Sequence, residues 1–148
     1  IQDGVILHGL EGRRVLNNNK LYSIYIGKSA TCGHGCIIHG PCKIGNNVFI
    51  GFHSIVFDAI VGDNCYISTN VLVTNGVKIG SNRFIPSGLI IDTQQKANEL
   101  GPVPKSKSEF AQEVQRVNNE FPNSYSLLFG ETKCSCGLAC DYRPIVNP

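Results

Sequence analysis

The chain has 148 residues, of which 42% are hydrophobic and 16% are charged, and its formal net charge is +2. This length fits one domain with a real core, and the apolar content excludes a disordered chain. The small charge, without a basic run or an aromatic platform, gives no sign of a nucleic-acid partner, and no stretch approaches the roughly 18 apolar residues of a membrane span.

The strongest pattern is a six-residue period of apolar side chains. It predicts an all-β fold, a parallel β-helix in which three hexapeptides, about 18 residues, close one triangular coil. Glycine and the pairs Asn46-Asn47 and Asp63-Asn64 suit the corners, where a positive φ is cheap or tolerable. The residues on the period are Ile26, Cys32, Ile38, Ile44, Ile50, Val56 and, after a slip of one residue, Val61, Ile67, Val73, Ile79, Ile85 and Ile91.

The first 92 residues are expected to form the β-helix coils. Ile1 and Leu7 also lie on the period, so we expect that earlier coils are missing from the N-terminal end. Residues 11–23 break the period with charges and three consecutive asparagines, which predicts a protruding loop.

Residues 93–130 should hold a linker and a C-terminal helix. Residues 93–105 predict a helical turn or two and then a stop at Gly-Pro and Pro, and the helix is expected over 106–121. Ser106 and Glu109 match a capping box, and Pro122 is expected to end the helix. One helix face carries Phe110, Val114, Val117 and Phe121, and it predicts that the helix packs along a flat wall of the β-helix.

Two histidines share one phase of the repeat. His8 follows Leu7 and His39 follows Ile38, and their separation of 31 residues, less the 13 residues of the loop, leaves 18, one coil. Stacked residues of adjacent coils lie about 4.8 Å apart, close enough for both imidazoles to reach one zinc ion at roughly 2.0–2.1 Å. His34 lies in another phase and is poorly placed to complete that site within its own chain, but in a trimer a neighbour's His34 could supply the third ligand.

Other interpretations of the histidines stay open. All three can be unrelated surface residues, as we expect for His53, which has no partner in phase. Hexapeptide acyltransferases use a single histidine as a base, and three histidines in this arrangement speak against that function.

The seven cysteines fall into two groups. Cys32, Cys36, Cys42 and Cys65 occupy inward positions, where cysteine fills a core like a small hydrophobe. Residues 131–148 form a tail with three more cysteines, Cys134, Cys136 and Cys140, which could begin a zinc site or form a redox-sensitive disulfide; we favour the disulfide.

Two segments carry a resemblance to a known family. Residues 1–11 (IQDGVILHGLE) and 33–41 (GHGCIIHGP) resemble the γ-class carbonic anhydrases, and within that class the γ-carbonic-anhydrase-like domains of carboxysome assembly proteins. The likeness continues through 49–52, 54–57, 85–88 and 93–95 to the tail cysteines.

The resemblance implies a left-handed β-helix and a homotrimer with one zinc ion at each subunit interface. His8 and His39 match the ligands from one subunit, and His34 matches the ligand from its neighbour. Co²⁺ or Fe²⁺ would also suit three imidazoles. A zinc ion with three histidines and an open position activates water, here for the hydration of CO₂ to bicarbonate.

The resemblance also implies roles around the metal. Gln2 and Asn118 would orient hydroxide or CO₂, and Glu11 would carry the proton away. Asp3 matches an aspartate that pairs with an arginine upstream of Ile1, and Arg116 stands where the best-known enzyme of the family has a tyrosine.

The tail and the partners follow from the same likeness. Cys134 and Cys140 match a cysteine pair, which implies a disulfide that makes the activity redox-dependent. The expected location is the carboxysome within the cytoplasm, with shell proteins, another carbonic anhydrase or Rubisco as partners. A catalytically silent scaffold that recruits these partners is the alternative.

Overall fold

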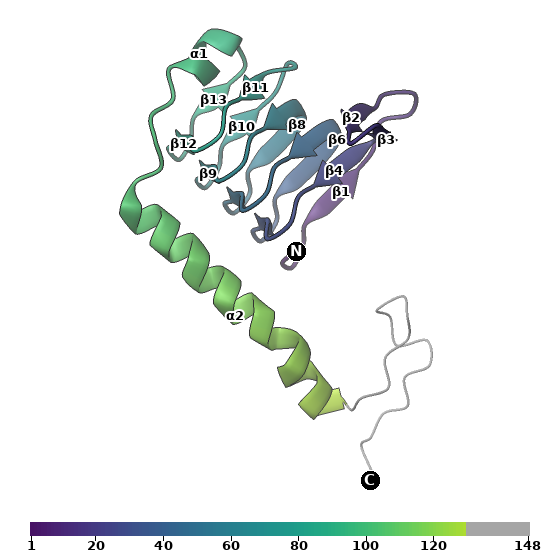
Figure 1. Ribbon diagram of the computed structural model, residues 1–148, viewed down its shortest axis with the longest axis vertical. Helices are drawn as coiled ribbons and strands as arrows, with labels where there is room; N and C mark the ends of the chain where they lie inside the picture. The colour runs from purple at the N-terminus through teal and green to yellow at the C-terminus, as the bar shows by residue number, and fades with distance from the viewer. Residues whose placement is uncertain (130–148) are drawn as a thin grey trace. The chain divides into compact units, whose positions relative to one another are not determined.

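The computed structural model describes residues 1–129, and side chains as far as residue 123. The chain divides into two compact units, Ile1–Ala111 and Gln112–Pro148. The first unit is a left-handed parallel β-helix, as the six-residue period and the family resemblance predicted (Figure 1).

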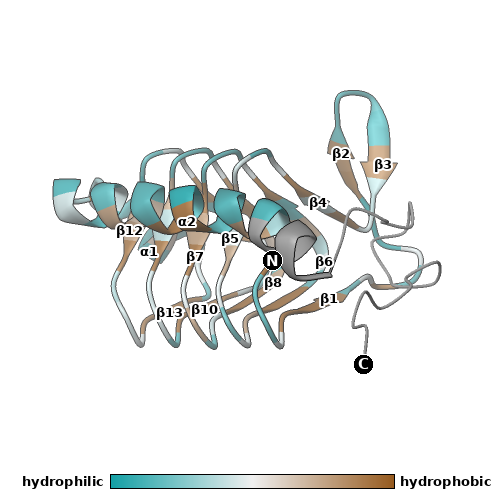
Figure 2. Ribbon diagram, turned by 90° about the horizontal axis from the view of Figure 1, so that it is seen from below, coloured by the Kyte–Doolittle hydropathy of each residue, from teal (hydrophilic) through white to brown (hydrophobic). Residues whose placement is uncertain are grey.

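Parallel strands of successive coils stack into three walls (Figure 2). The first wall contains, in spatial order, β1 (Ile6–His8), the start of β6 (Ile37–Ile44), the start of β8 (Ile55–Val61), β10 (Leu72–Val73) and β13 (Ile90–Ile91). The second wall contains β4 (Ile24–Ile26), the ends of β6 and β8, and β11 (Lys78–Ile79). The third wall contains β5 (Thr31–Cys32), β7 (Phe49–Ile50), β9 (Tyr66–Ile67) and β12 (Phe84–Ile85).

Residues on the six-residue period form the core. All of them from Cys32 to Ile91 are buried, while Ile26 is partly buried. Inward cysteines join the same core, as predicted for Cys32, Cys36, Cys42 and Cys65. Leu7 shares the phase but stays exposed, because the first described coil has a neighbouring coil on one side only.

One corner of the triangle is held by a ladder of side chains. Asn46 Oδ1 accepts a hydrogen bond from the Lys28 backbone N–H at 2.9 Å, and Asp63 Oδ1 accepts one from the Asn46 N–H at 2.7 Å. Ser81 Oγ continues the ladder by accepting from the Asp63 N–H at 3.1 Å. Gly45 lies beneath this ladder, where a Cβ would come within 2.7 Å of the Gly62 backbone. The coils therefore approach too closely here for a side chain.

The predicted loop at residues 11–23 is a β-hairpin. Strands β2 (Val15–Asn17) and β3 (Lys20–Tyr22) pair antiparallel, and they are joined by Asn18 and Asn19 with φ of 47° and 61°. Two consecutive residues of positive φ make the tight turn that suits the strand twist, and asparagine tolerates them. Three asparagines in a row therefore mark a hairpin turn rather than an irregular loop.

A short helix closes the end of the β-helix. Helix α1 (Gln94–Asn98) begins after Thr93, whose hydroxyl accepts a hydrogen bond from the Lys96 N–H at 3.3 Å. Ala97 and Leu100 are buried against the last coil. This helix is the turn predicted within residues 93–105.

Helix α2 (Lys105–Phe129) differs from the prediction at both ends. The capping box at Ser106 is wrong, because the helix begins one residue earlier and the Pro104 carbonyl accepts from the N–H groups of Lys107 and Ser108. Pro122 does not end the helix and lies inside it. An interior proline removes one backbone donor and crowds the carbonyl four residues earlier, which costs stability without ending the helix here.

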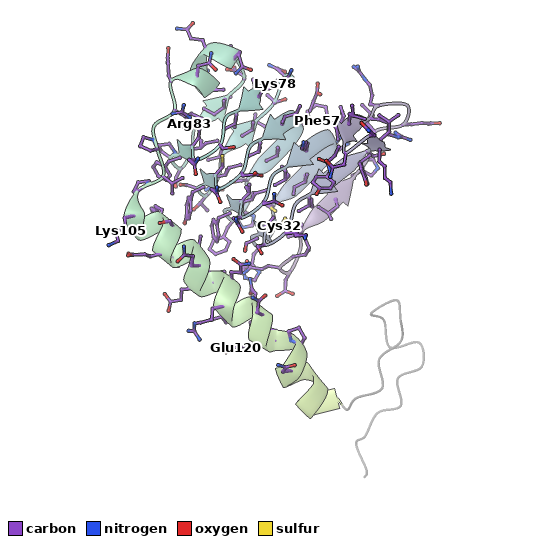
Figure 3. All side chains as sticks on the ribbon, viewed as in Figure 1. Cys32, Phe57, Lys78, Arg83, Lys105 and Glu120 are labelled. Atoms are coloured by element: carbon purple, nitrogen blue, oxygen red, sulfur yellow. The ribbon has the colours of Figure 1, made fainter. Side chains whose placement is uncertain are left out.

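The start of α2 packs on the third wall (Figure 3). Phe110 lies edge-on to Phe49, with ring centroids 5.7 Å apart. The later residues of the apolar face belong to the second unit, and their packing stays a prediction. Among residues 1–129, no helix has the length and apolar character needed to cross a bilayer.

Adjacent residues of β6 test the inward and outward alternation. Ile44 is fully buried, so Ile44→Ala should lower the free energy of unfolding by about 2–5 kcal/mol. Lys43 points outward from the same strand, and Lys43→Ala should change it by about 0.5 kcal/mol or less. Urea unfolding monitored by circular dichroism measures both. Equal losses in the two variants would contradict the core described above.

Candidate metal centre

The parallel pairing of β1 with β6 places His8 directly beside His39. Their Cα atoms are register partners, and the two ring centroids are 4.9 Å apart. His8 Nδ1 lies 3.0 Å from His39 Nε2. The one-coil register predicted from the 13-residue loop is therefore present, and the two imidazoles turn nitrogen atoms toward each other.

Backbone and aromatic contacts hold the His39 ring. Its Nδ1–H donates to the Gly40 carbonyl at 3.0 Å, which leaves the Nε2 lone pair facing His8. The Phe57 ring stands perpendicular to the His39 ring, with centroids 5.0 Å apart. The Cys42 thiol donates to the His39 carbonyl at 2.9 Å. His39 is thus fixed in the tautomer that a metal ligand requires.

The spacing of the two nitrogens suits a shared metal ion. Two ligands about 2.05 Å from one tetrahedral zinc ion lie roughly 3.3 Å apart, and these two nitrogens are separated by 3.0 Å. A small rotation of the exposed His8 ring would make up the difference. Without a metal, one nitrogen can donate a hydrogen bond to the other, so the pair is stable in both states.

His34 lies apart from this pair, in the turn between β5 and β6. Its ring centroid is 5.4 Å from that of Phe52, and its Nδ1 is 3.9 Å from Asp3 Oδ2. Within the described part of the chain, no three histidine, cysteine or acidic side chains gather closely enough to hold a metal. One chain therefore presents two converging imidazoles and a third that points elsewhere.

Gln2 and Asp3 accompany His34 rather than the His8–His39 pair. Gln2 Oε1 accepts a hydrogen bond from the His34 backbone N–H at 3.2 Å, and Asp3 is fully exposed beside the His34 ring. If His34 belongs to a neighbour's metal site, these two side chains enter that site with it.

The first unit does not bring the remaining predicted site residues next to His8 and His39. Glu11 is exposed in the turn before the hairpin. Arg116 pairs with Glu120 at 3.0 Å along α2, and Asn118 is half-buried on the same helix, both in the second unit. Cys134, Cys136 and Cys140 lie outside the described residues.

Three of the core cysteines, Cys36, Cys42 and Cys65, are poor metal ligands. Burial raises the pKa of Cys42 to about 11, and burial also raises the pKa of Cys65. The hydrogen bond that the Cys36 thiol donates to Cys32, together with burial, raises the pKa of Cys36. Because metals bind thiolates, these protonated thiols serve the core instead.

Two contacts that hold His39, with Phe57 and with the Gly40 carbonyl, are not evident from residue types alone. Phe57 follows His39 by 18 residues, so the arithmetic that paired the histidines also places it in their row. The Gly40 carbonyl is a backbone group, so the sequence does not mark it. Only the glycine itself is visible there, and it packs against the Ser23 carbonyl.

Removing either paired histidine should abolish tight metal binding. In metal-stripped protein, His8→Ala and His39→Ala should each weaken zinc binding strongly. The loss should exceed the about 10–100-fold that is typical when a residue hydrogen-bonded to a metal ligand is removed. His53→Ala is the matched control and should keep the wild-type affinity. Competition with a chromophoric chelator measures all three, and unchanged affinity in His39→Ala would refute the site.

Sequence comparison relates the chain to known proteins. No family model matches the chain. It is 41% identical over 142 residues, 95% of its length, to the carboxysome assembly protein CcmM of Nostoc sp., and the match spans 25% of that relative. It is 35% identical over 113 residues to a carbonic anhydrase of Methanosarcina thermophila, which is 70% of this chain and 45% of the relative.

A more distant relative is the mitochondrial gamma carbonic anhydrase 1 of Arabidopsis thaliana, with 28% identity over 88 residues, 60% of this chain and 29% of the relative. The chain thus spans about a quarter of the CcmM relative and less than half of the Methanosarcina thermophila enzyme. It belongs to the γ-class carbonic anhydrase family, and it matches the γ-carbonic-anhydrase-like part of the carboxysome assembly protein CcmM.

Proposed function

We propose that this chain forms a zinc-dependent carbonic anhydrase that interconverts CO₂ and bicarbonate. The observation that carries the proposal is the 3.0 Å approach of His8 Nδ1 to His39 Nε2, with the His39 tautomer set by the Gly40 carbonyl. The carbonic anhydrases among its relatives support the same chemistry.

The proposal places the metal between subunits of a homotrimer. Each chain offers two converging imidazoles, and His34 points in another direction. An apolar row next to the pair favours a second copy as the neighbour. Along the first wall, five outward aliphatic side chains align from coil to coil, and Ile6 and Ile90 at its ends are each 52% exposed. The row consists of Ile6, Ile37, Ile55, Leu72 and Ile90.

A second copy covering this row would hide apolar surface and deliver its own His34 to the His8–His39 pair. The row lies two residues before the His8–His39–Phe57 row on the same wall. Because side chains two residues apart share a face of a strand, burying one row brings the neighbour to the other.

Zn²⁺, or Co²⁺ or Fe²⁺ in its place, would be held by His8, His39 and the partner's copy of His34. When bound, such a metal supplies the Lewis acidity that makes water a nucleophile near neutral pH. The chain's own residues do the rest. The Gly40 carbonyl holds the His39 ring, and the Phe57 edge shields one side of it from water.

Three further residues have proposed roles in proton transfer and orientation. Gln2 uses its amide oxygen on the His34 backbone, which leaves its NH₂ group free to donate to a reacting oxygen. Asn118 would orient CO₂, and Glu11 on its exposed turn would pass the proton to solvent. Arg116 and Asp3 would adjust the charge around the site.

The carboxysome is the proposed location, within the cytoplasm. The name of the CcmM relatives, carboxysome assembly protein, favours this place and also a second function. In that second function the β-helix is a catalytically silent scaffold that recruits shell proteins, another carbonic anhydrase or Rubisco. An acyltransferase is the least supported alternative, and acetyl-CoA should have no effect on the protein.

Mixed trimers test the interfacial site. His34→Ala and His39→Ala proteins should each be inactive in CO₂ hydration. After subunit exchange, activity should return in part, because a mixed trimer can contain one interface that keeps all three histidines. Stopped-flow measurement with a pH indicator follows the reaction.

The matched control mixes His8→Ala with His39→Ala, which remove ligands of the same chain. Every interface then lacks at least one of them, so this mixture should stay inactive. Recovery in both mixtures, or in neither, would contradict a metal shared between subunits.

The tail cysteines are proposed to make the activity redox-dependent. A Cys134–Cys140 disulfide would close a short loop, and such bridges typically stabilise by about 2–4 kcal/mol. Activity should be high after oxidation and low after reduction. Cys134→Ser and Cys140→Ser should each remove this dependence, whereas Cys136→Ser should keep it. Equal activity of the unmodified protein with and without reductant would exclude the disulfide switch.

A further inference from the structure

A pocket lies between the third wall and the first turns of α2, entirely within the first unit. Its volume is about 210 Å³. It is separate from the His8–His39 pair on the first wall, and no proposed role above uses it. Figure 3 shows the start of α2, marked by Lys105, beside this wall.

Aromatic rings form the walls of the pocket. Phe49 and Tyr66 stack on adjacent coils with centroids 4.6 Å apart and planes 13° apart. Phe110 closes over them, edge-on to Phe49. Such rings present apolar faces with partial negative charge and edges with partial positive charge, so the attraction for an anion must come from the other groups of the pocket.

One positive charge reaches the pocket without a carboxylate partner. Lys107 Nζ lies 5.7 Å from the centre of the Tyr66 ring, and no carboxylate among the described residues is within 4.0 Å of it. Lys105, two residues earlier, is instead paired with Glu109, with Nζ 3.7 Å from the Glu109 carboxylate. The charge of Lys107 is therefore available to a ligand.

Two hydroxyl groups complete the polar lining. Ser68 is only 7% exposed, yet its Oγ makes no hydrogen bond to any described residue. Among the described residues no fully inaccessible side-chain oxygen lacks a partner, so this hydroxyl keeps some accessible surface, and Ser68 lines the pocket. The neighbouring Thr69 hydroxyl is also without a hydrogen bond among described residues. Both can donate to an acceptor inside.

These groups select the ligand by charge and shape. An ammonium group and two hydroxyl donors suit a small anion, and Lys107 would repel a cation. The volume of about 210 Å³ limits this anion to a small one. Bicarbonate is flat, carries one charge, and has three oxygen atoms for these donors.

Phe52 connects the pocket with the proposed chemistry. Its ring lines the pocket and also lies against His34, with centroids 5.4 Å apart. We infer that the pocket binds bicarbonate through Lys107, Ser68 and Thr69, as a holding site for the anion one aromatic ring away from His34. This role rests on the proposed carbonic anhydrase function, although the binding itself requires no metal.

Metal-stripped protein separates this site from the metal centre. Titrating ¹³C-bicarbonate with the full chain at constant ionic strength, set with sodium chloride, should broaden its NMR line. Lys107→Gln should weaken binding at least about tenfold, as expected for the loss of one charge-assisted hydrogen bond. Lys105→Gln is the matched control, because Lys105 does not line the pocket, and it should keep the broadening.

Three outcomes would overturn the inference. Absence of broadening in the unmodified chain would mean that the pocket does not hold the ion. Equal broadening in Lys107→Gln and the unmodified chain would place the ion elsewhere, and broadening only after zinc is restored would place it at the histidines. Failure of CO₂ hydration would refute the proposed enzyme and leave this binding result unchanged.

Discussion

The backbone hydrogen bonds between adjacent coils are the constraint on which the rest of the structure depends. They hold each strand in parallel register with the strand one coil away, so equivalent positions stack in rows. Inward rows become the apolar core, and the row of Asn46, Asp63 and Ser81 becomes a corner ladder. Outward rows form the surface, among them the aliphatic row from Ile6 to Ile90 and the row of His8, His39 and Phe57. A ligand pair thus arises wherever two suitable residues occupy one row.

The same constraint limits what one chain can assemble. A row can supply ligands only along its own line of stacked residues. His34 lies outside that row, beside Gln2 and Asp3. A third ligand for the pair must therefore come from outside the row. The exposed aliphatic row next to the pair offers a surface on which a second copy can bring that ligand. In this account, catalysis and assembly depend on the same wall of the β-helix.

The sequence predicts features that depend on the period, and it misses those that depend on local geometry. The core, the inward cysteines and the His8–His39 register all follow from counting residues along the coils. The hairpin turn at Asn18 and Asn19 depends on backbone conformation, and helix α2 continues through Pro122 because one lost donor does not stop it. The Gly40 carbonyl beside His39 and the unpartnered Ser68 hydroxyl depend on packing, which no residue pattern reveals.

A crystal structure of the zinc-loaded protein, with anomalous diffraction measured at the zinc edge, tests the central claim most directly. The account predicts one zinc peak per chain, bonded to His8 and His39 of one subunit and to the copy of His34 in its neighbour. It also predicts that the Gly40 carbonyl still accepts from His39 Nδ1–H. A zinc ion bound by residues of a single subunit, or none near His8 and His39, would contradict it.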